Sequence, residues 1–77
     1  MRLEKLQQFM NGKNIPFTYT EEGGLGSIDF EYRGLSYHVW EFEEGGYGAE
    51  SNVKNAGRTE DYVGDYEATI MNIMKDW

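Results

Sequence analysis

Residues 27–40 read SIDFEYRGLSYHVW, and this stretch decides the fold. Polar and apolar side chains alternate in both of its halves, which is the pattern of two half-buried β-strands. The halves meet at Arg33-Gly34, and a glycine in the second place of a two-residue loop suits the primed turns that join antiparallel strands. In this hairpin Ile28 faces Val39, and the neighbouring apolar pairs fall on the same face. The sequence therefore predicts an antiparallel hairpin with one buried face.

Further strands are predicted on both sides of this hairpin. We expect strands over residues 15–21, 27–33, 35–43 and, less regularly, 47–53. Pro16 suits the first position of an edge strand, because it has no N–H to donate to a neighbour. A four-residue turn at 43–46 would set Phe42 beside Tyr47 in the last pair of strands. The middle of the chain is therefore predicted to be an antiparallel meander of three or four strands.

Helices are predicted at the two ends of the chain. Residues 2–13 carry apolar side chains at three- and four-residue spacing, which places them on one stripe. A polar loop is expected at 54–58, followed by a second helix that begins at a Thr59 cap and continues to Trp77. Glycine is unfavourable inside a helix, so Gly64-Asp65 offers a second starting point, with the aspartate as the cap.

These elements predict a two-layer α+β domain. The order is helix–β–β–β(–β)–helix, and two amphipathic helices can cover one face of an antiparallel meander sheet. A chain of 77 residues is expected to form a single domain, residues 1–77. The expected core is Leu3, Leu6, Phe9 or Met10, Phe17, Ile28, Phe30, Tyr37, Val39, Tyr66, Ile70 and Ile73.

The composition excludes several classes of protein. There is no cysteine, so disulfides and thiolate metal sites are excluded. No apolar run is long enough for a membrane span, and no basic segment leads into an apolar one as in a signal peptide. No calcium loop or phosphate loop is present, and we expect no metal and no cofactor. These features together predict a cytoplasmic protein that does not contact membranes.

The negative charge is concentrated in the middle of the sequence. The net charge is −7, and the stretch between Glu21 and Glu50 holds eight acids against one base, Arg33. Acids and bases balance in the rest of the chain. The acidic stretch is either a solvated face that maintains solubility or a surface offered to a basic partner. It argues against direct nucleic-acid binding, because phosphate contact needs clustered lysine and arginine.

Aromatic side chains change face at the end of the predicted hairpin. Trp40 and Phe42 fall on the face opposite Val39, and aromatic residues are enriched in binding hot spots. An uncovered face would make them a contact surface for a protein partner or a second copy of the chain. A β-bulge that turns them inward, or cover by the second helix and Trp77, would instead make them structural. The candidate protein-contact patch is Trp40, Phe42, Tyr47, Glu31, Glu41 and Glu43.

The single histidine has one candidate catalytic partner. The hairpin register places His38 opposite Asp29, and a carboxylate can orient an imidazole for acid–base chemistry. Such a pair is also an ordinary cross-strand contact on a sheet surface. No serine, cysteine or second histidine is placed to complete a nucleophilic site, so we expect no catalytic residues.

Two resemblances bear on this interpretation. The helix–β–β–β–helix order resembles the double-stranded-RNA-binding domain, whose second helix begins with phosphate-binding lysines. The matching segment here, residues 59–65, is acidic, so that function is not carried over. The runs at 26–30, 34–41 and 48–53 resemble a group of small uncharacterised acidic proteins of bacteria, chiefly gut Firmicutes. Some of that group are labelled kinases, but no kinase motif is present here, and this resemblance implies only a bacterial cytoplasmic origin.

Three functions follow as hypotheses. The first is a small intracellular, non-catalytic protein-interaction module. The second is an acidic nucleic-acid mimic that inhibits a basic partner protein. The third, which the residues support least, is a small enzyme that uses His38 and Asp29.

Overall fold

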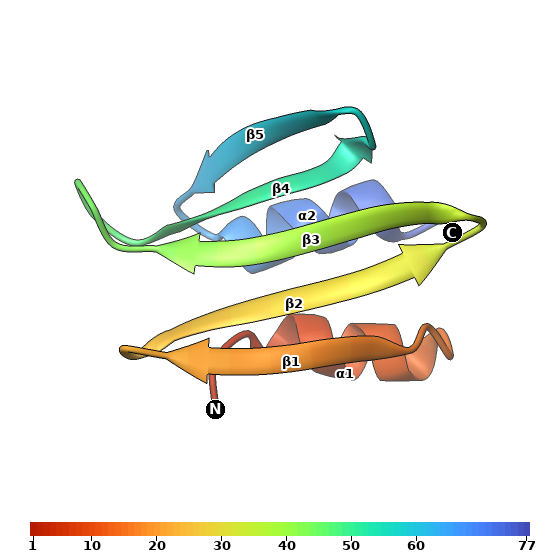
Figure 1. The fold of residues 1–77 in the computed structure, drawn as a ribbon, viewed down its shortest axis with the longest axis horizontal. Helices are drawn as coiled ribbons and strands as arrows, with labels where there is room; N and C mark the ends of the chain where they lie inside the picture. Colours follow the sequence, from red (N-terminus) through yellow and green to blue (C-terminus); the bar gives the residue numbers. More distant parts are fainter.

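A computed structural model describes all 77 residues and shows an α+β fold (Figure 1). The elements are α1 (Glu4–Gly12), β1 (Phe17–Glu22), β2 (Leu25–Tyr32), β3 (Leu35–Phe42), β4 (Gly48–Asn55), β5 (Arg58–Val63) and α2 (Tyr66–Met74). The five strands form one antiparallel sheet in sequential order, and both helices lie behind the same face of it (Figure 1). The predicted two-layer arrangement is therefore confirmed, with five strands in place of three or four.

The central hairpin has the predicted register. Ile28 pairs with Val39, and Asp29 pairs with His38. Arg33 and Gly34 both have positive φ, 52° and 81°, as a primed two-residue turn requires. The backbone twist of such a turn matches that of the strands, so the turn and the alternation support the same pairing.

The segment after β4 differs from the prediction. Residues 54–58 are not a loop, and Thr59 does not cap a helix. Instead β4 extends to Asn55 and turns directly into β5, whose side chains alternate between half-buried and exposed positions. Glu60 and Asp61 follow Thr59 as acids often follow a helix cap, but here they form a strand by hydrogen bonding to β4.

The second helix begins at the alternative site. Gly64 has a φ of 71°, which ends β5, and Asp65 then caps α2 by accepting a hydrogen bond from Ala68 N at 3.2 Å. The helix is therefore shorter than expected. Neither helix is long and apolar enough to cross a membrane.

The pairing of β3 with β4 is shifted by one residue from the prediction. Phe42 lies beside Gly48 rather than Tyr47, and Trp40 lies beside Glu50. A Cβ atom on Gly48 would come within 2.6 Å of the Phe42 ring and of the Tyr62 carbonyl oxygen. A Cβ atom here would force the ring or the strand backbone to shift, so glycine suits the position beside Phe42.

The core lies between the sheet and the helices. Its fully or nearly buried side chains are Leu3, Leu6, Met10, Ile15, Ile28, Phe30, Val39, Ala49, Val53, Ile70 and Met74. Met10 rather than Phe9 is buried. The other predicted core members, Phe17, Tyr37, Tyr66 and Ile73, are half-buried at its margin.

Candidate functional site

The sheet face turned away from the helices is uncovered, and we call it the open face (Figure 1). Its side chains alternate along each strand with those that enter the core. The register places these residues on it: Thr18, Thr20, Ser27, Asp29, Glu31, Ser36, His38, Trp40, Phe42, Glu50, Thr59, Asp61 and Val63.

Trp40 is fixed in position at the centre of the open face. It is 41% exposed, and its indole Nε1 donates a hydrogen bond to Asp29 Oδ1 at 3.0 Å. The His38 ring lies beside it, with the ring centroids 4.3 Å apart. The large aromatic surface is therefore held in one orientation while a substantial part of it faces solvent.

Phe42 borders a hollow on the same face. The hollow has a volume of about 290 Å³, and its other lining residues are Glu44, Glu50 and Asp61. Glu50 and Asp61 are direct cross-strand neighbours of β4 and β5. Like charges in directly opposed positions repel, so this pair destabilises the isolated sheet. An aromatic ring and three carboxylates thus surround one depression.

The predicted patch is only partly brought together. Trp40, Phe42 and Glu31 lie on the open face, and Glu43 is exposed in the turn after β3. Tyr47 is 55% exposed but does not join them, because the Arg2 guanidinium lies over its ring, 5.1 Å from the centroid.

Glu41 does not belong to the patch. It alternates with Trp40 and therefore shares the face of Val39, where it is buried. The alternation of the strand indicates this position, because Glu41 lies two residues from Val39. The pairing of β4 with β5 shifts in register between Ser51 and Asn55, but this irregularity does not turn Trp40 inward.

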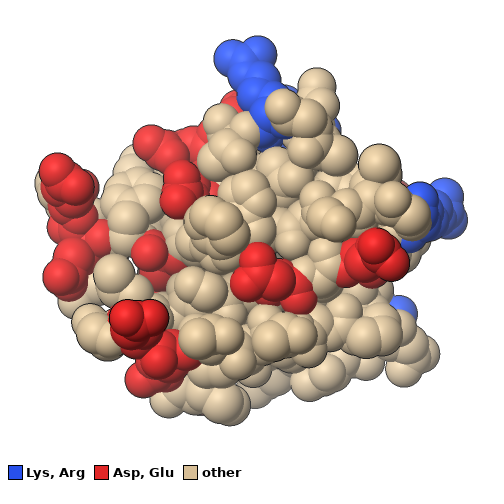
Figure 2. All heavy atoms as spheres, viewed as in Figure 1, with Lys and Arg blue, Asp and Glu red and all other residues tan.

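The open face carries negative charge that no basic group of the chain neutralises. Figure 2 views this face and shows acidic side chains spread over it, with basic side chains at its margin. The one ion pair of the protein joins Arg2 to Glu41 on the helix side. The open-face acids Asp29, Glu31, Glu50 and Asp61 therefore have no ion-pair partner.

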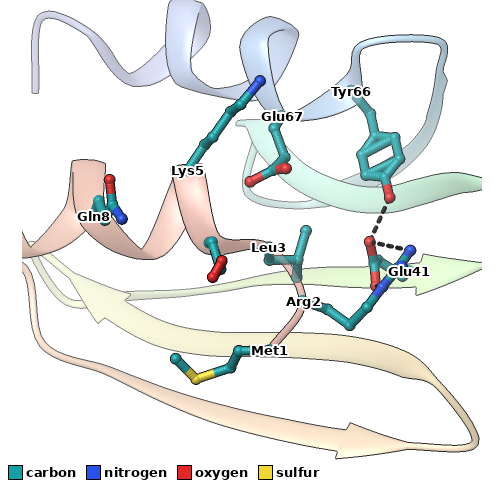
Figure 3. Close-up of a pocket in the computed structure, with 9 residues that line it drawn as sticks. Met1, Arg2, Leu3, Lys5, Gln8, Glu41, Tyr66 and Glu67 are labelled. Carbon is teal, nitrogen blue, oxygen red and sulfur yellow. Dashed lines mark hydrogen bonds and ion pairs between the residues drawn. The ribbon is translucent and has the colours of Figure 1, made fainter.

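A second polar cluster lies on the helix side, around the buried Glu41 carboxylate (Figure 3). Glu41 Oε1 accepts hydrogen bonds from Arg2 Nε at 2.9 Å and from Gly26 N at 2.8 Å. Its Oε2 accepts from Arg2 Nη2 at 3.2 Å and from the Tyr66 hydroxyl. Glu67 extends this arrangement, since its carboxylate accepts from Leu6 N at 2.9 Å and so caps α1 from α2.

The pKa values in this cluster follow from burial and hydrogen bonding. Burial acts to raise the pKa of Glu41, but the bonds from Arg2, Tyr66 and Gly26 outweigh it and hold the pKa below its ordinary value. Burial, together with the bond to Glu41, raises the pKa of Tyr66 to about 12. The carboxylate thus stays charged and the phenol stays protonated at neutral pH.

The Glu41 cluster is suited to anchoring the N-terminal segment. A hollow of about 410 Å³ lies beside it, lined by the N-terminal segment, by Glu41 and by residues of α1 and α2. The four donors already occupy the lone pairs of the carboxylate, so Glu41 has no free acceptor to offer a ligand. Arg2 lies 39 positions from Glu41, and no local sequence signal joins them.

His38 and Asp29 are opposite each other, but they are not hydrogen-bonded. The Asp29 carboxylate is directed to Trp40, and His38 Nε2 lies 3.4 Å from Thr59 Oγ1. His38 lines none of the three hollows of the protein. The structure contains no group of three or more histidine, aspartate or glutamate side chains suited to holding a metal ion.

Trp77 lies on the helix side of the sheet and does not cover Trp40. Its ring stacks on Tyr32 with centroids 4.7 Å apart and meets Tyr37 at 4.9 Å. These three rings line a third hollow of about 410 Å³, beside Arg33 and Lys54. Trp77 therefore packs on the helix side of the sheet and leaves the open face uncovered.

Comparison with known proteins gives no relative: no family model, no curated protein and no solved structure matches this chain.

Proposed function

We propose that the protein is a small, non-catalytic protein-interaction module that binds its partner with the open face. The observation that carries this proposal is the exposed Trp40, flanked by Phe42, on a sheet face that neither helix covers.

The geometry favours binding in two ways. Tryptophan supplies large contact area and is among the residues most enriched in interface hot spots. Trp40 is also held by its bond to Asp29, so little side-chain freedom is lost when a partner covers it. An aromatic residue that is exposed but already ordered is what a preformed contact surface provides.

The second candidate function is an acidic mimic that occupies the nucleic-acid-binding surface of another protein. It is favoured by the strand register, which puts Asp29, Glu31, Glu50 and Asp61 on one face. Figure 2 shows acidic side chains spread over that face. Such a mimic is a special case of the interaction module, in which the partner is a basic nucleic-acid-binding protein. Catalysis by His38 has less support, because Asp29 is bonded elsewhere and His38 borders no hollow.

Affinity capture from cells that produce the protein tests the proposal when matched variants are compared. Trp40→Ala removes the central contact, whereas Leu35→Ala removes another exposed apolar side chain, 49% exposed and away from the open face. We expect a protein to be captured by the wild type and by Leu35→Ala but lost with Trp40→Ala. Circular dichroism checks that both variants are folded. Capture that survives Trp40→Ala, or that neither variant alters, would contradict the proposal.

A further inference from the structure

We propose that the partner presents an arginine-bearing cationic segment to the open face, with an arginine side chain seated in the hollow beside Phe42. This inference rests on the proposed function and names the chemistry of its partner. It follows from the charge and shape of the open face.

The two ends of the sheet differ in charge. In a meander, alternate turns lie at the same end, so the turns at 23–24 and 43–47 share one end and those at 33–34 and 56–57 share the other (Figure 1). The first end carries Glu21, Glu22, Glu43 and Glu44, and the second carries Arg33, Lys54 and Arg58. The one base at the first end, Arg2, is paired with Glu41 on the helix side, so the acids continue without a counter-charge from the open face to this end.

The acids on the open face have no counter-charge. The only ion pair of the protein is on the helix side, and Asp29 is the one open-face acid with a side-chain hydrogen bond, from Trp40. Uncompensated charge over an aromatic surface attracts a partner of opposite sign and disfavours other partners. Charge complementarity therefore selects a cationic partner.

The hollow beside Phe42 suits a cation. Glu50 and Asp61 repel each other across β4 and β5, and a cation between them would relieve that repulsion. The ring of Phe42 at the same hollow can receive a cation on its face. A guanidinium is planar, stacks on rings and bonds carboxylates in pairs, whereas an ammonium is a compact point charge. The hollow therefore suits arginine better than lysine.

Charge disfavours two other occupants of the open face. A second copy of the chain would bring another −7 charge to a face that is already acidic, and nucleic acid would bring phosphates. Both are repelled. A basic segment of another protein is the occupant that the charge favours.

The test uses a nine-residue oligoarginine peptide added to isotope-labelled protein at physiological salt, followed by amide chemical shifts. We expect shifts at residues 40–42, 50 and 61, and weaker binding by a matched oligolysine. The double variant Glu50→Gln/Asp61→Asn should bind about five- to tenfold more weakly, since it loses two charge pairs, one at the half-buried Glu50 and one at the exposed Asp61. The control Glu4→Gln/Asp76→Asn changes the net charge equally, at exposed sites on or beside the helices, and should lose at most about twofold.

Three results would overturn the inference. Equal weakening by both double variants would show long-range attraction to an acidic protein and no site. Oligolysine binding as tight as oligoarginine would remove the case for arginine. Sedimentation showing a dimer that Trp40→Ala dissociates would assign the open face to a second copy. Capture that depends on Trp40, combined with any of these results, would retain the proposed function and reject only this inference.

Discussion

Glu41→Gln is the substitution whose effect on stability the structure defines best. The side chain of Glu41 is 2% exposed, and its two oxygens accept four hydrogen bonds. Glutamine keeps the size of the side chain but replaces one acceptor oxygen with an amide that donates. Two donors then lose their acceptor: either Arg2 Nη2 and the Tyr66 hydroxyl, or Arg2 Nε and Gly26 N.

The expected loss can be estimated from these bonds. A hydrogen bond to a charged group contributes about 1.5–3 kcal/mol, and a buried donor without an acceptor costs about 1–3 kcal/mol. The Arg2 side chain is 36% exposed, so water can accept a hydrogen bond from the Arg2 N–H that loses its acceptor. The lost Arg2 bond therefore costs only about 0–1 kcal/mol. We therefore expect Glu41→Gln to lower the free energy of unfolding by about 2–4 kcal/mol. A domain of this size has a total of only about 4–12 kcal/mol.

Urea denaturation followed by circular dichroism measures this loss. With a slope of about 1–1.5 kcal/mol/M, the midpoint should fall by about 1.3–4 M. Glu43→Gln is the matched control, because Glu43 is exposed and its side chain makes no hydrogen bond; it should change stability by less than about 0.5 kcal/mol. A Glu41→Gln midpoint equal to that of the control would refute the buried cluster.

Two further results are expected. The pKa of Glu41 is lower in the folded protein than in the unfolded chain, where it is about 4.3. The stability that this carboxylate contributes is therefore present above about pH 4.3 and is lost as the pH falls through the folded pKa. Acid unfolding curves should be less steep in Glu41→Gln than in the wild type, and identical curves would contradict the shift. Gly48→Ala should cost about 1–3 kcal/mol, because its Cβ would meet the Phe42 ring at 2.6 Å, whereas Gly57→Ala, whose nearest contact is 3.8 Å, should cost less than about 1 kcal/mol in thermal melts. Equal costs for the two glycines would show that the sheet adapts to the added methyl group.

The central hairpin was predictable because two independent signals agree there. The alternation around Ile28 and Val39 fixes which face is buried, and Arg33-Gly34 fixes the turn, so the register has one solution. Placement of Trp40 and Phe42 on the opposite face follows from the same alternation. The sequence also allows a bulge that turns these two residues inward, and only the pairing of β3 with β4 decides between the alternatives.

The fifth strand and the Glu41 cluster were not predictable in this way. Residues 58–63 become a strand through pairing with β4, and that pairing shifts in register between Ser51 and Asn55. Local propensity does not encode that pairing. The hollow beside Phe42 needs Asp61 from this strand, so sequence reasoning missed it too. The Arg2–Glu41 pair joins residues far apart in the chain, and only the fold brings them together.

The central claim is that the open face, and not the helical layer, meets the partner. Site-specific photo-crosslinking in cells that make the protein tests this most directly, with the crosslinker at exposed Ser36 on the open face or at exposed Asn72 on α2. We predict a crosslinked partner from position 36 that disappears with Trp40→Ala, and none from position 72. A partner crosslinked from position 72 and not from position 36 would contradict the account.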